Sequence, residues 1–214
     1  MIETRLLPAE TGIEEAIRVL RDGGLVAFPT DTVYGLGAHA LLPHAVERIY
    51  LAKARPRGKA IPLLVADAAS LETVASAVPE SARKLAAAFW PGALTIVLHR
   101  AASVPEAVTQ GAPSIAVRAP SHPIAQALIR GLGAPIAATS ANISGSGSLT
   151  TAQAVFNALR GRIELVLDGG ASPIGVESSI VDLCGEHPRI LRQGAIPTEA
   201  IEAVLAPLTV ERVQ

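Results

Sequence analysis

The hydrophobic pattern at the beginning of the chain predicts an amphipathic helix followed by a short buried strand. Apolar residues recur at helical spacing over residues 13–20, and Thr11 with Glu14 three positions later is typical of a capping box at a helix start. Two glycines at 23–24 end this pattern. The apolar run 25–28 that follows is bounded by glycine and proline, which favours a buried strand.

The rest of the chain alternates short apolar runs with amphipathic stretches. Strands are expected at residues 61–66, 94–98, 115–117, 135–138, 163–167, 180–183 and 189–191. Helices are expected at residues 43–54, 79–89, 121–130, 151–160 and 197–205. Because strands and helices interleave without a break in composition, the pattern predicts one α/β domain built on a mixed sheet.

Composition and charge narrow the classes of protein that fit. The chain has 214 residues, which suits one large domain. Hydrophobic residues make up 50% of it and aromatic residues only 3%, so Ala, Val, Leu and Ile must build the core. The formal net charge of -1 lacks the strongly basic balance of a protein that lives on nucleic acid.

The cysteine content and the hydropathy of the sequence indicate the cellular compartment in which the protein is found. Cys184 is the only cysteine of the sequence, which excludes an internal disulfide or a multi-cysteine zinc site and favours a reducing compartment. No apolar run approaches the roughly 18 residues that a membrane span needs. Residues 1–8 also lack the apolar segment of a secretory signal. We therefore expect a cytoplasmic protein with no membrane partner.

The segment FPTDTVYGLG, residues 28–37, follows the first predicted strand. Its two threonines, aspartate and tyrosine, followed by Gly35 and Gly37, can present hydroxyls and backbone N–H groups to a small polar ligand. It has neither the lysine of a Walker loop nor a full dinucleotide fingerprint. The alternative interpretation is a glycine-containing turn between a strand and a helix.

A cationic segment, KARPRGK at residues 53–59, joins a predicted helix to a predicted strand. Its four cations could together neutralise a triphosphate, since arginine offers a planar fork and lysine a compact charge. They are Lys53, Arg55, Arg57 and Lys59. Alternatively, cations favour a helix C-terminus and remain solvated there. Both interpretations stay open on these residues alone.

Two further segments place polar groups at predicted strand ends. Arg118 ends the apolar run SIAVR, and it either pairs with a structural carboxylate or reaches a ligand carboxylate in a pocket. Residues 139–148, TSANISGSGS, lie just past another strand, where open α/β sheets bind ligands, although a solvated loop would have the same composition. The sequence contains no familiar catalytic signature, which suits a reaction driven by positioning and charge neutralisation.

Five segments in this order resemble the YrdC/YciO family. They are FPTDTVYGLG, the set Lys53, Arg55 and Lys59, SIAVR, TSANISG with Ser148, and GVESSIVD with ILRQG. The resemblance covers about residues 13–205. It implies a single catalytic domain over residues 1–214, a short or truncated member of the family, with a twisted mixed β-sheet and flanking helices around a concave ligand cavity.

For activity, the resemblance implies an adenylate-forming nucleotidyltransferase. L-threonine, bicarbonate or carbon dioxide, and ATP with Mg²⁺ would give L-threonylcarbamoyladenylate and pyrophosphate. The product would then supply threonylcarbamoyl transfer to an adenosine of certain tRNAs through downstream transferase proteins. No metal ligand is expected from the protein side chains.

The site residues of the family carry over onto matching positions of this chain. The resemblance implies Lys53, Arg55 and Lys59 as the catalytic, phosphate-holding set. It implies Arg55, Lys59, Ser114, Ser140, Asn142, Ser148 and Arg192 for ATP, and Thr32, Arg118, Ala138 and Ser178 for threonine. One departure is RPRGKAIPL after residue 55, which supplies Lys59 where some members have an asparagine, so no role carries over to Ile61.

Two alternatives to the synthase remain at this point. A non-catalytic RNA-binding module of the same fold would contact tRNA or RNA weakly through a basic groove, but the net charge and the sparse aromatic residues count against it. A YciO-type paralogue would act on another substrate. The complete set of implied phosphate and nucleotide residues favours the synthase over that paralogue.

Overall fold

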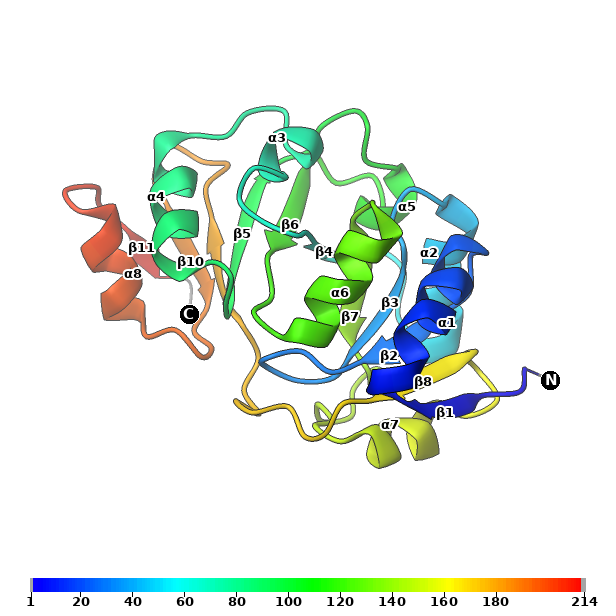
Figure 1. Cartoon of the computed structure of the whole chain (residues 1–214). Coiled ribbons are helices and arrows are strands. Elements are labelled where there is room, and N and C mark those ends of the chain that lie inside the picture. The colour runs from blue at the N-terminus through cyan, green and yellow to red at the C-terminus, as the bar shows by residue number, and fades with distance from the viewer. Residues whose placement is uncertain (1, 213–214) are drawn as a thin grey trace.

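The computed structural model describes residues 2–212, which form one eleven-stranded mixed sheet flanked by helices (Figure 1). The strands are β1 (Arg5–Pro8), β2 (Val26–Phe28), β3 (Gly35–His39), β4 (Leu63–Leu64), β5 (Leu94–His99), β6 (Ser114–Arg118), β7 (Ile136–Ser140), β8 (Leu165–Asp168), β9 (Ser179–Asp182), β10 (Arg189–Arg192) and β11 (Glu211–Arg212). The helices are α1 (Ala9–Arg21), α2 (Pro43–Lys53), α3 (Leu71–Val74), α4 (Glu80–Phe89), α5 (Glu106–Thr109), α6 (Pro123–Leu132), α7 (Ala152–Leu159) and α8 (Thr198–Leu205). The predicted α/β class is confirmed.

Strand order brings distant parts of the sequence together. The sheet runs β1-β8-β2-β3-β7-β4-β6-β5-β9-β10-β11. Strand β3 pairs antiparallel with both β2 and β7, whereas β4 pairs parallel with β6 and β5 parallel with β9. The segments that carry the expected site residues therefore lie on or next to the consecutive strands from β3 to β10 in this order.

Helices α1 and α6 lie together over one part of the sheet (Figure 1). Helix α1 buries Ala9, Gly12, Ala16 and Leu20, which form an apolar stripe at spacings of three and four residues. The backbone of α1 approaches the sheet closely at Gly12, where a Cβ would lie 2.7 Å from Leu167 Cδ2. This close packing fixes α1 against β8.

A second and larger core joins the sheet to α2, α4, α5, α7 and α8. Its side chains are mostly aliphatic, with Val46 and Ile49 from α2, Leu85 from α4 and Val155 from α7. Tyr34 is the one large aromatic side chain among its fully buried members in the described part of the chain. The expectation that aliphatic residues build the core is confirmed.

The predicted elements are found with small shifts at their ends, but the predicted capping box is wrong. Helix α1 begins at Ala9, two residues before Thr11, and its N-cap is Pro8, which has no side-chain cap. The hydroxyl of Thr11 lies inside the first turn, 3.5 Å from the carbonyl oxygen of Pro8. The short elements β1, β11, α3 and α5 were not predicted, because runs of two to four residues carry little periodicity.

The segment 28–37 also differs from the turn between a strand and a helix considered above. Residues 29–34 form an irregular connection, and Gly35–His39 is then strand β3, antiparallel to β2. A Cβ on Gly37 would lie 2.6 Å from Ile136 Cγ2 and 2.8 Å from Phe28 Cε1. This glycine therefore serves close packing of the strand rather than a turn.

Candidate active site

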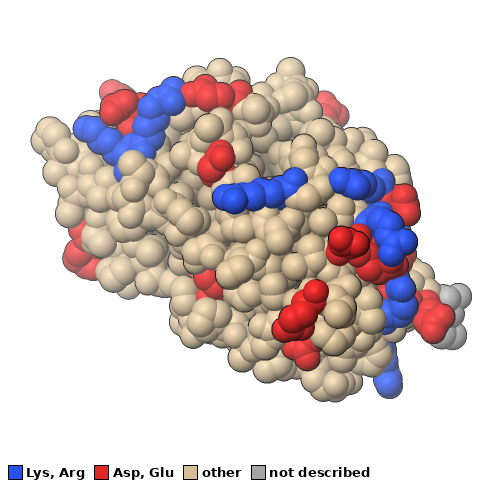
Figure 2. Space-filling model, in the orientation of Figure 1, with Lys and Arg blue, Asp and Glu red and all other residues tan. Residues whose placement is uncertain are grey.

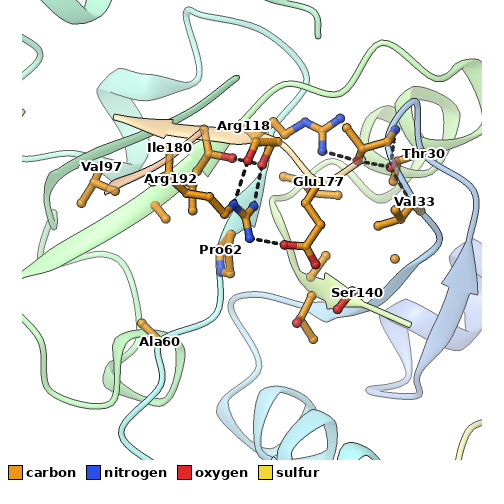
Figure 3. Close-up of a pocket in the computed structure, with 18 of the residues that line it drawn as sticks. Thr30, Val33, Ala60, Pro62, Val97, Arg118, Ser140, Glu177, Ile180 and Arg192 are labelled. Carbon is orange, nitrogen blue, oxygen red and sulfur yellow. Dashed lines mark hydrogen bonds and ion pairs between the residues drawn. The ribbon is translucent and has the colours of Figure 1, made fainter. Parts of the chain in front are cut away.

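One cavity of about 590 Å³ opens on the sheet and gathers most of the expected site residues (Figure 3). Alternate residues of the strands line it, because successive side chains of a strand point to opposite faces. Strand β6 contributes Ser114, Ala116 and Arg118, and β5 contributes Thr95 and Val97. Of the expected residues, the lining includes Thr32, Arg55, Lys59, Ser114, Arg118, Ala138, Ser140, Ser178 and Arg192.

The guanidinium of Arg118 is buried, with its side chain 7% exposed, and is held from three directions. Its Nε donates to the carbonyl oxygen of Gly92 and its Nη1 donates to Thr32 Oγ1, each at 2.8 Å. Its Nη2 lies 2.6 Å from Asp31 Oδ1 in an ion pair. Burial lowers the pKa of Arg118, and the carboxylate of Asp31 opposes that shift. The arginine therefore has a structural carboxylate partner and also faces the cavity.

The hydroxyl of Thr32 is left with acceptor capacity only. Thr30 donates its one hydroxyl hydrogen to the carbonyl oxygen of Val33 at 2.7 Å, so it can only accept in its 3.0 Å contact with Thr32 Oγ1. Thr32 thus gives its hydrogen to Thr30 and accepts one hydrogen bond from Arg118. The remaining lone pair suits the N–H of a ligand amine rather than a ligand carboxylate.

Ser178 lies between the two implied subsites. Its Oγ is 2.8 Å from Thr95 Oγ1 and 3.3 Å from Arg192 Nη2, and its carbonyl oxygen accepts from Arg192 Nε at 3.0 Å. Arg192 also pairs with Glu177, whose Oε1 accepts from Ser148 Oγ at 2.8 Å. In Figure 3 the Arg192 side chain extends toward Glu177 within the cavity. This chain of contacts links residues implied for threonine with residues implied for ATP.

A second, cationic cavity of about 380 Å³ adjoins the first. The two share Arg55, Lys59 and Ser140, and the second is also lined by Lys53 and Asn142. Arg55 is held by its own segment, because its Nη2 donates to the carbonyl oxygen of Ala60 at 3.0 Å. This pair of cavities offers a continuous run of positive charge with hydroxyl and amide groups beside it, which suits a polyphosphate.

Arg57 differs from its neighbours in the cationic segment. It forms an ion pair with Glu47 at 2.7 Å, and its side chain is two-thirds exposed. It lines neither of the two cavities. Three of the four cations of residues 53–59 thus converge, and the fourth faces solvent.

Lys53 is almost fully buried, with 1% of its surface exposed. Its ammonium donates to the carbonyl oxygens of Ser140 and Asn142, and lies 3.3 Å from Asn142 Oδ1. Burial and the charge of Arg55 lower the pKa of Lys53 to about 8, while Glu177 opposes the shift. Lys53 therefore fastens the end of β7 to the C-terminus of α2, in addition to lining the second cavity.

This burial makes stability depend on pH. The pKa of Lys53 is about 8 in the fold and 10.5 ordinarily, so the fold bears the cost of a buried ammonium below pH 8 and loses that cost as pH rises toward 10.5. We expect the unfolding free energy to rise over this range by about 3 kcal/mol more than in Lys53→Met. Urea unfolding of both proteins across the range measures it. If the difference in unfolding free energy between the two proteins does not change with pH, the carbonyl partners of Lys53 keep it protonated over this range.

Besides Lys53, which lines only the second cavity, two other expected residues lie outside the first cavity. Asn142 lines only the second cavity, and its Nδ2 donates to the carbonyl oxygen of Ile143 at 3.0 Å. Ser148 lines neither cavity and reaches the first one only through Glu177. The individual roles of all these residues stay predictions.

Sequence reasoning assigned Thr30 and Asp31 only a general part in a polar ligand-binding segment, and it assigned Thr95 and Glu177 no specific role. The signal for Asp31 was present, since a lone arginine at the end of a buried strand needs a partner and an aspartate stands in the polar segment after β2. Thr95 and Glu177 gave no such signal. Thr95 meets Ser178 through the parallel pairing of β5 with β9, and Glu177 meets Arg192 through the antiparallel pairing of β9 with β10, neither of which sequence patterns reveal.

The surface carries charges of both signs (Figure 2). Figure 2 shows acidic and basic side chains mixed on the face drawn, with broad uncharged stretches between them. Between residues 2 and 212, no group of three or more His, Cys, Asp or Glu side chains could hold a metal ion. No helix in that same range is long and apolar enough to cross a bilayer.

Comparison with known proteins places this geometry in a family. The Sua5/YciO/YrdC family model, described as "Telomere recombination", matches residues 18–194. The threonylcarbamoyl-AMP synthase of Pyrococcus abyssi is 46% identical over 210 residues, covering 98% of this chain and 62% of that protein. The threonylcarbamoyl-AMP synthase of Bacillus subtilis is 46% identical over 201 residues, covering 94% of this chain and 58% of that protein.

A solved relative shares the three-dimensional structure as well. The crystal structure of Pyrococcus abyssi Sua5 complexed with L-threonine matches with a TM-score of 0.91 at 45% identity, covering 99% of this chain and 62% of that one. This chain spans about 60% of the length of the two curated relatives. Because the family model and both relatives match most of this chain, it belongs to the Sua5/YciO/YrdC family.

Proposed function

We propose that this protein is an L-threonylcarbamoyladenylate synthase. It would bind L-threonine, bicarbonate or carbon dioxide, and ATP in the cavity on the sheet, and release pyrophosphate. The relatives named threonylcarbamoyl-AMP synthase, and the Sua5 structure that contains L-threonine, support this function. We also propose that the site residues implied by the family resemblance bind these substrates.

One observation carries the proposal: a single cavity is lined by two chemically different groups of side chains. Arg118 offers N–H donors and Thr32 an acceptor, which together match the carboxylate and the amine of an amino acid. Arg55 and Lys59 lie where the cavity meets its cationic neighbour, which matches a triphosphate. An amino acid and a nucleotide could thus react within this one cavity.

The proposed chemistry needs no protein nucleophile. The threonine amine bonds to the carbon of carbon dioxide and releases a proton to solvent, or it bonds to the carbon of bicarbonate with loss of water, to give a carbamate. A carbamate oxygen then attacks the α-phosphorus of ATP, and the bond from that phosphorus to the oxygen of the β-phosphate breaks. The protein holds the two reactants in line, and Arg55 and Lys59 stabilise the charge on the departing pyrophosphate.

Mg²⁺ is proposed to arrive with ATP, held by phosphate oxygens. The donor set of the chain fits this assignment, because Glu177 in the cavity lining is already paired with Arg192 and Ser148. Bound Mg²⁺ would supply further neutralisation of the phosphate charge. We further propose that the product passes to transferase proteins that modify tRNA in the cytoplasm, which agrees with the single cysteine of the sequence.

The test is direct detection of the product. Purified protein is incubated with threonine, bicarbonate and ATP with Mg²⁺, and threonylcarbamoyladenylate is measured by mass spectrometry alongside pyrophosphate release. Product should form only when all three substrates are present. Salt-sensitive RNA binding without turnover would instead support a binding module, and ATP turnover with another substrate would support a YciO-type paralogue.

A further inference from the structure

Asp31 is a buried carboxylate that lies behind the cavity rather than in its lining. Its side chain is 7% exposed, and it is not among the described residues that line either cavity. Its Oδ1 accepts from the backbone N–H of Ser121 at 3.1 Å and lies 2.6 Å from Arg118 Nη2. Asp31 is therefore anchored to the backbone before α6 and reaches the cavity only through Arg118.

Three contacts define the plane of the Arg118 guanidinium. Hydrogen bonds to Gly92 and Thr32 fix Nε and Nη1, which are two points on a line. Asp31 holds the third point, Nη2, and so prevents the group from swinging about that line. A planar fork binds a carboxylate well only in the correct orientation.

The guanidinium retains donors for a ligand. Its Nε–H and one Nη1–H are used by the hydrogen bonds to Gly92 and Thr32, and Nη2 is paired with Asp31. The second Nη1–H has no partner among the described residues. An unpaired buried donor is costly unless a ligand satisfies it. The ion pair thus orients Arg118 without consuming all of its donors.

We propose that Asp31 is a positioning residue of the amino-acid subsite, which holds the Arg118 guanidinium in the plane that accepts the substrate carboxylate. The proposal rests on the proposed function, since it takes threonine as the ligand. The alternative role, in which Asp31 only neutralises the charge of Arg118, predicts a different result. If Asp31 only neutralised Arg118, its removal would strengthen the attraction for an anionic carboxylate, whereas loss of orientation weakens binding.

The experiment compares Asp31→Ala, Asp31→Asn and Asp31→Glu with the wild-type protein. The readouts are the KM values for threonine and ATP, kcat, and threonine binding by calorimetry without ATP. We expect the threonine KM to rise by about tenfold in Asp31→Ala and by about threefold in Asp31→Asn, which keeps the shape and loses the charge. The KM for ATP should change by less than about twofold, and Asp31→Glu should restore part of the threonine affinity.

Asp182→Asn is a matched control. Asp182 is also buried, pairs with Arg189 at 2.6 Å and accepts from the backbone N–H of Cys184 at 2.9 Å, but it lines neither cavity. This variant should lose stability without a selective change in the threonine KM. It separates the loss of a buried, paired carboxylate in general from the loss of Arg118 orientation, although the Arg189 partner is 45% exposed.

Each outcome decides between the interpretations. Equal or tighter threonine binding in Asp31→Asn, with wild-type binding intact, would overturn the positioning role and leave the proposed function standing. A wild-type protein that neither binds threonine nor forms product would refute the proposed function and the inference together. Should Asp31→Ala fail to fold, Asp31→Asn and Asp31→Glu carry the comparison, with circular dichroism as the check on folding.

Discussion

In the Arg118→Ala variant, the KM for threonine is expected to rise by roughly tenfold to over a hundredfold, with a much smaller change for ATP. The physical reason is the loss of the charge-assisted hydrogen bonds that we propose Arg118 makes to the substrate carboxylate, since such bonds contribute about 1.5–3 kcal/mol. Steady-state kinetics with each substrate varied in turn measures the split. An ATP requirement that rises more than the threonine requirement would mean that the two subsites are assigned the wrong way round.

The stability of the Arg118→Ala variant must be measured separately from its threonine affinity. Arg118→Ala leaves the carboxylate of Asp31 buried without its partner, which costs about 3–5 kcal/mol in comparable proteins. Arg118→Lys keeps a cation beside Asp31 but lacks the planar fork, so it should fold more stably and still bind threonine weakly. Normal threonine affinity in Arg118→Lys would show that charge alone, not the fork, recognises the carboxylate.

The second large effect is expected for Arg55→Ala, in which synthesis falls roughly tenfold to over a hundredfold while the fold persists. Arg55 lines both cavities and is only half-buried, so its removal takes away the charge that we propose binds phosphate and removes little core packing. Product formation at saturating and limiting ATP, with thermal unfolding as the folding check, measures the effect.

Arg57→Ala is the matched control for this prediction. Arg57 belongs to the same segment and carries the same charge, but it pairs with Glu47 and faces solvent. Its removal should leave synthesis nearly unchanged, since exposed ion pairs contribute little. Full activity in Arg55→Ala, or equal losses in both variants, would refute a specific phosphate role for Arg55.

Most of the element types could be predicted because periodicity records which face of a helix or strand is buried. The runs 94–98 and 115–117 were expected as strands and are found in β5 and β6. The run 61–66 was also expected as a strand, yet only Leu63–Leu64 pairs as β4. An apolar pattern reports burial, whereas the length of a strand depends on how far its neighbours extend beside it.

The candidate site was predictable as a set of residues but not as an arrangement. The ordered motifs placed Thr32, Arg118 and the cationic segment in one expected site. The structure brings Thr32, Arg118 and two cations of that segment, Arg55 and Lys59, to the same cavity. The sequence also named Lys53 as a phosphate ligand only, which leaves out the part that it plays in the fold. Its ammonium is buried against Ser140 and Asn142.

What the sequence alone determined is therefore the α/β class, the apolar faces and the order of the polar segments, because these depend on local spacing and composition. The tertiary structure decided which polar groups meet. Lys53 and Ser140 stand 87 positions apart, and Arg118 and Thr32 stand 86 apart. Such pairs form because the strand order β3-β7-β4-β6 brings together segments that are far apart in the sequence. That order follows from packing the whole sheet against its helices, which no local pattern encodes.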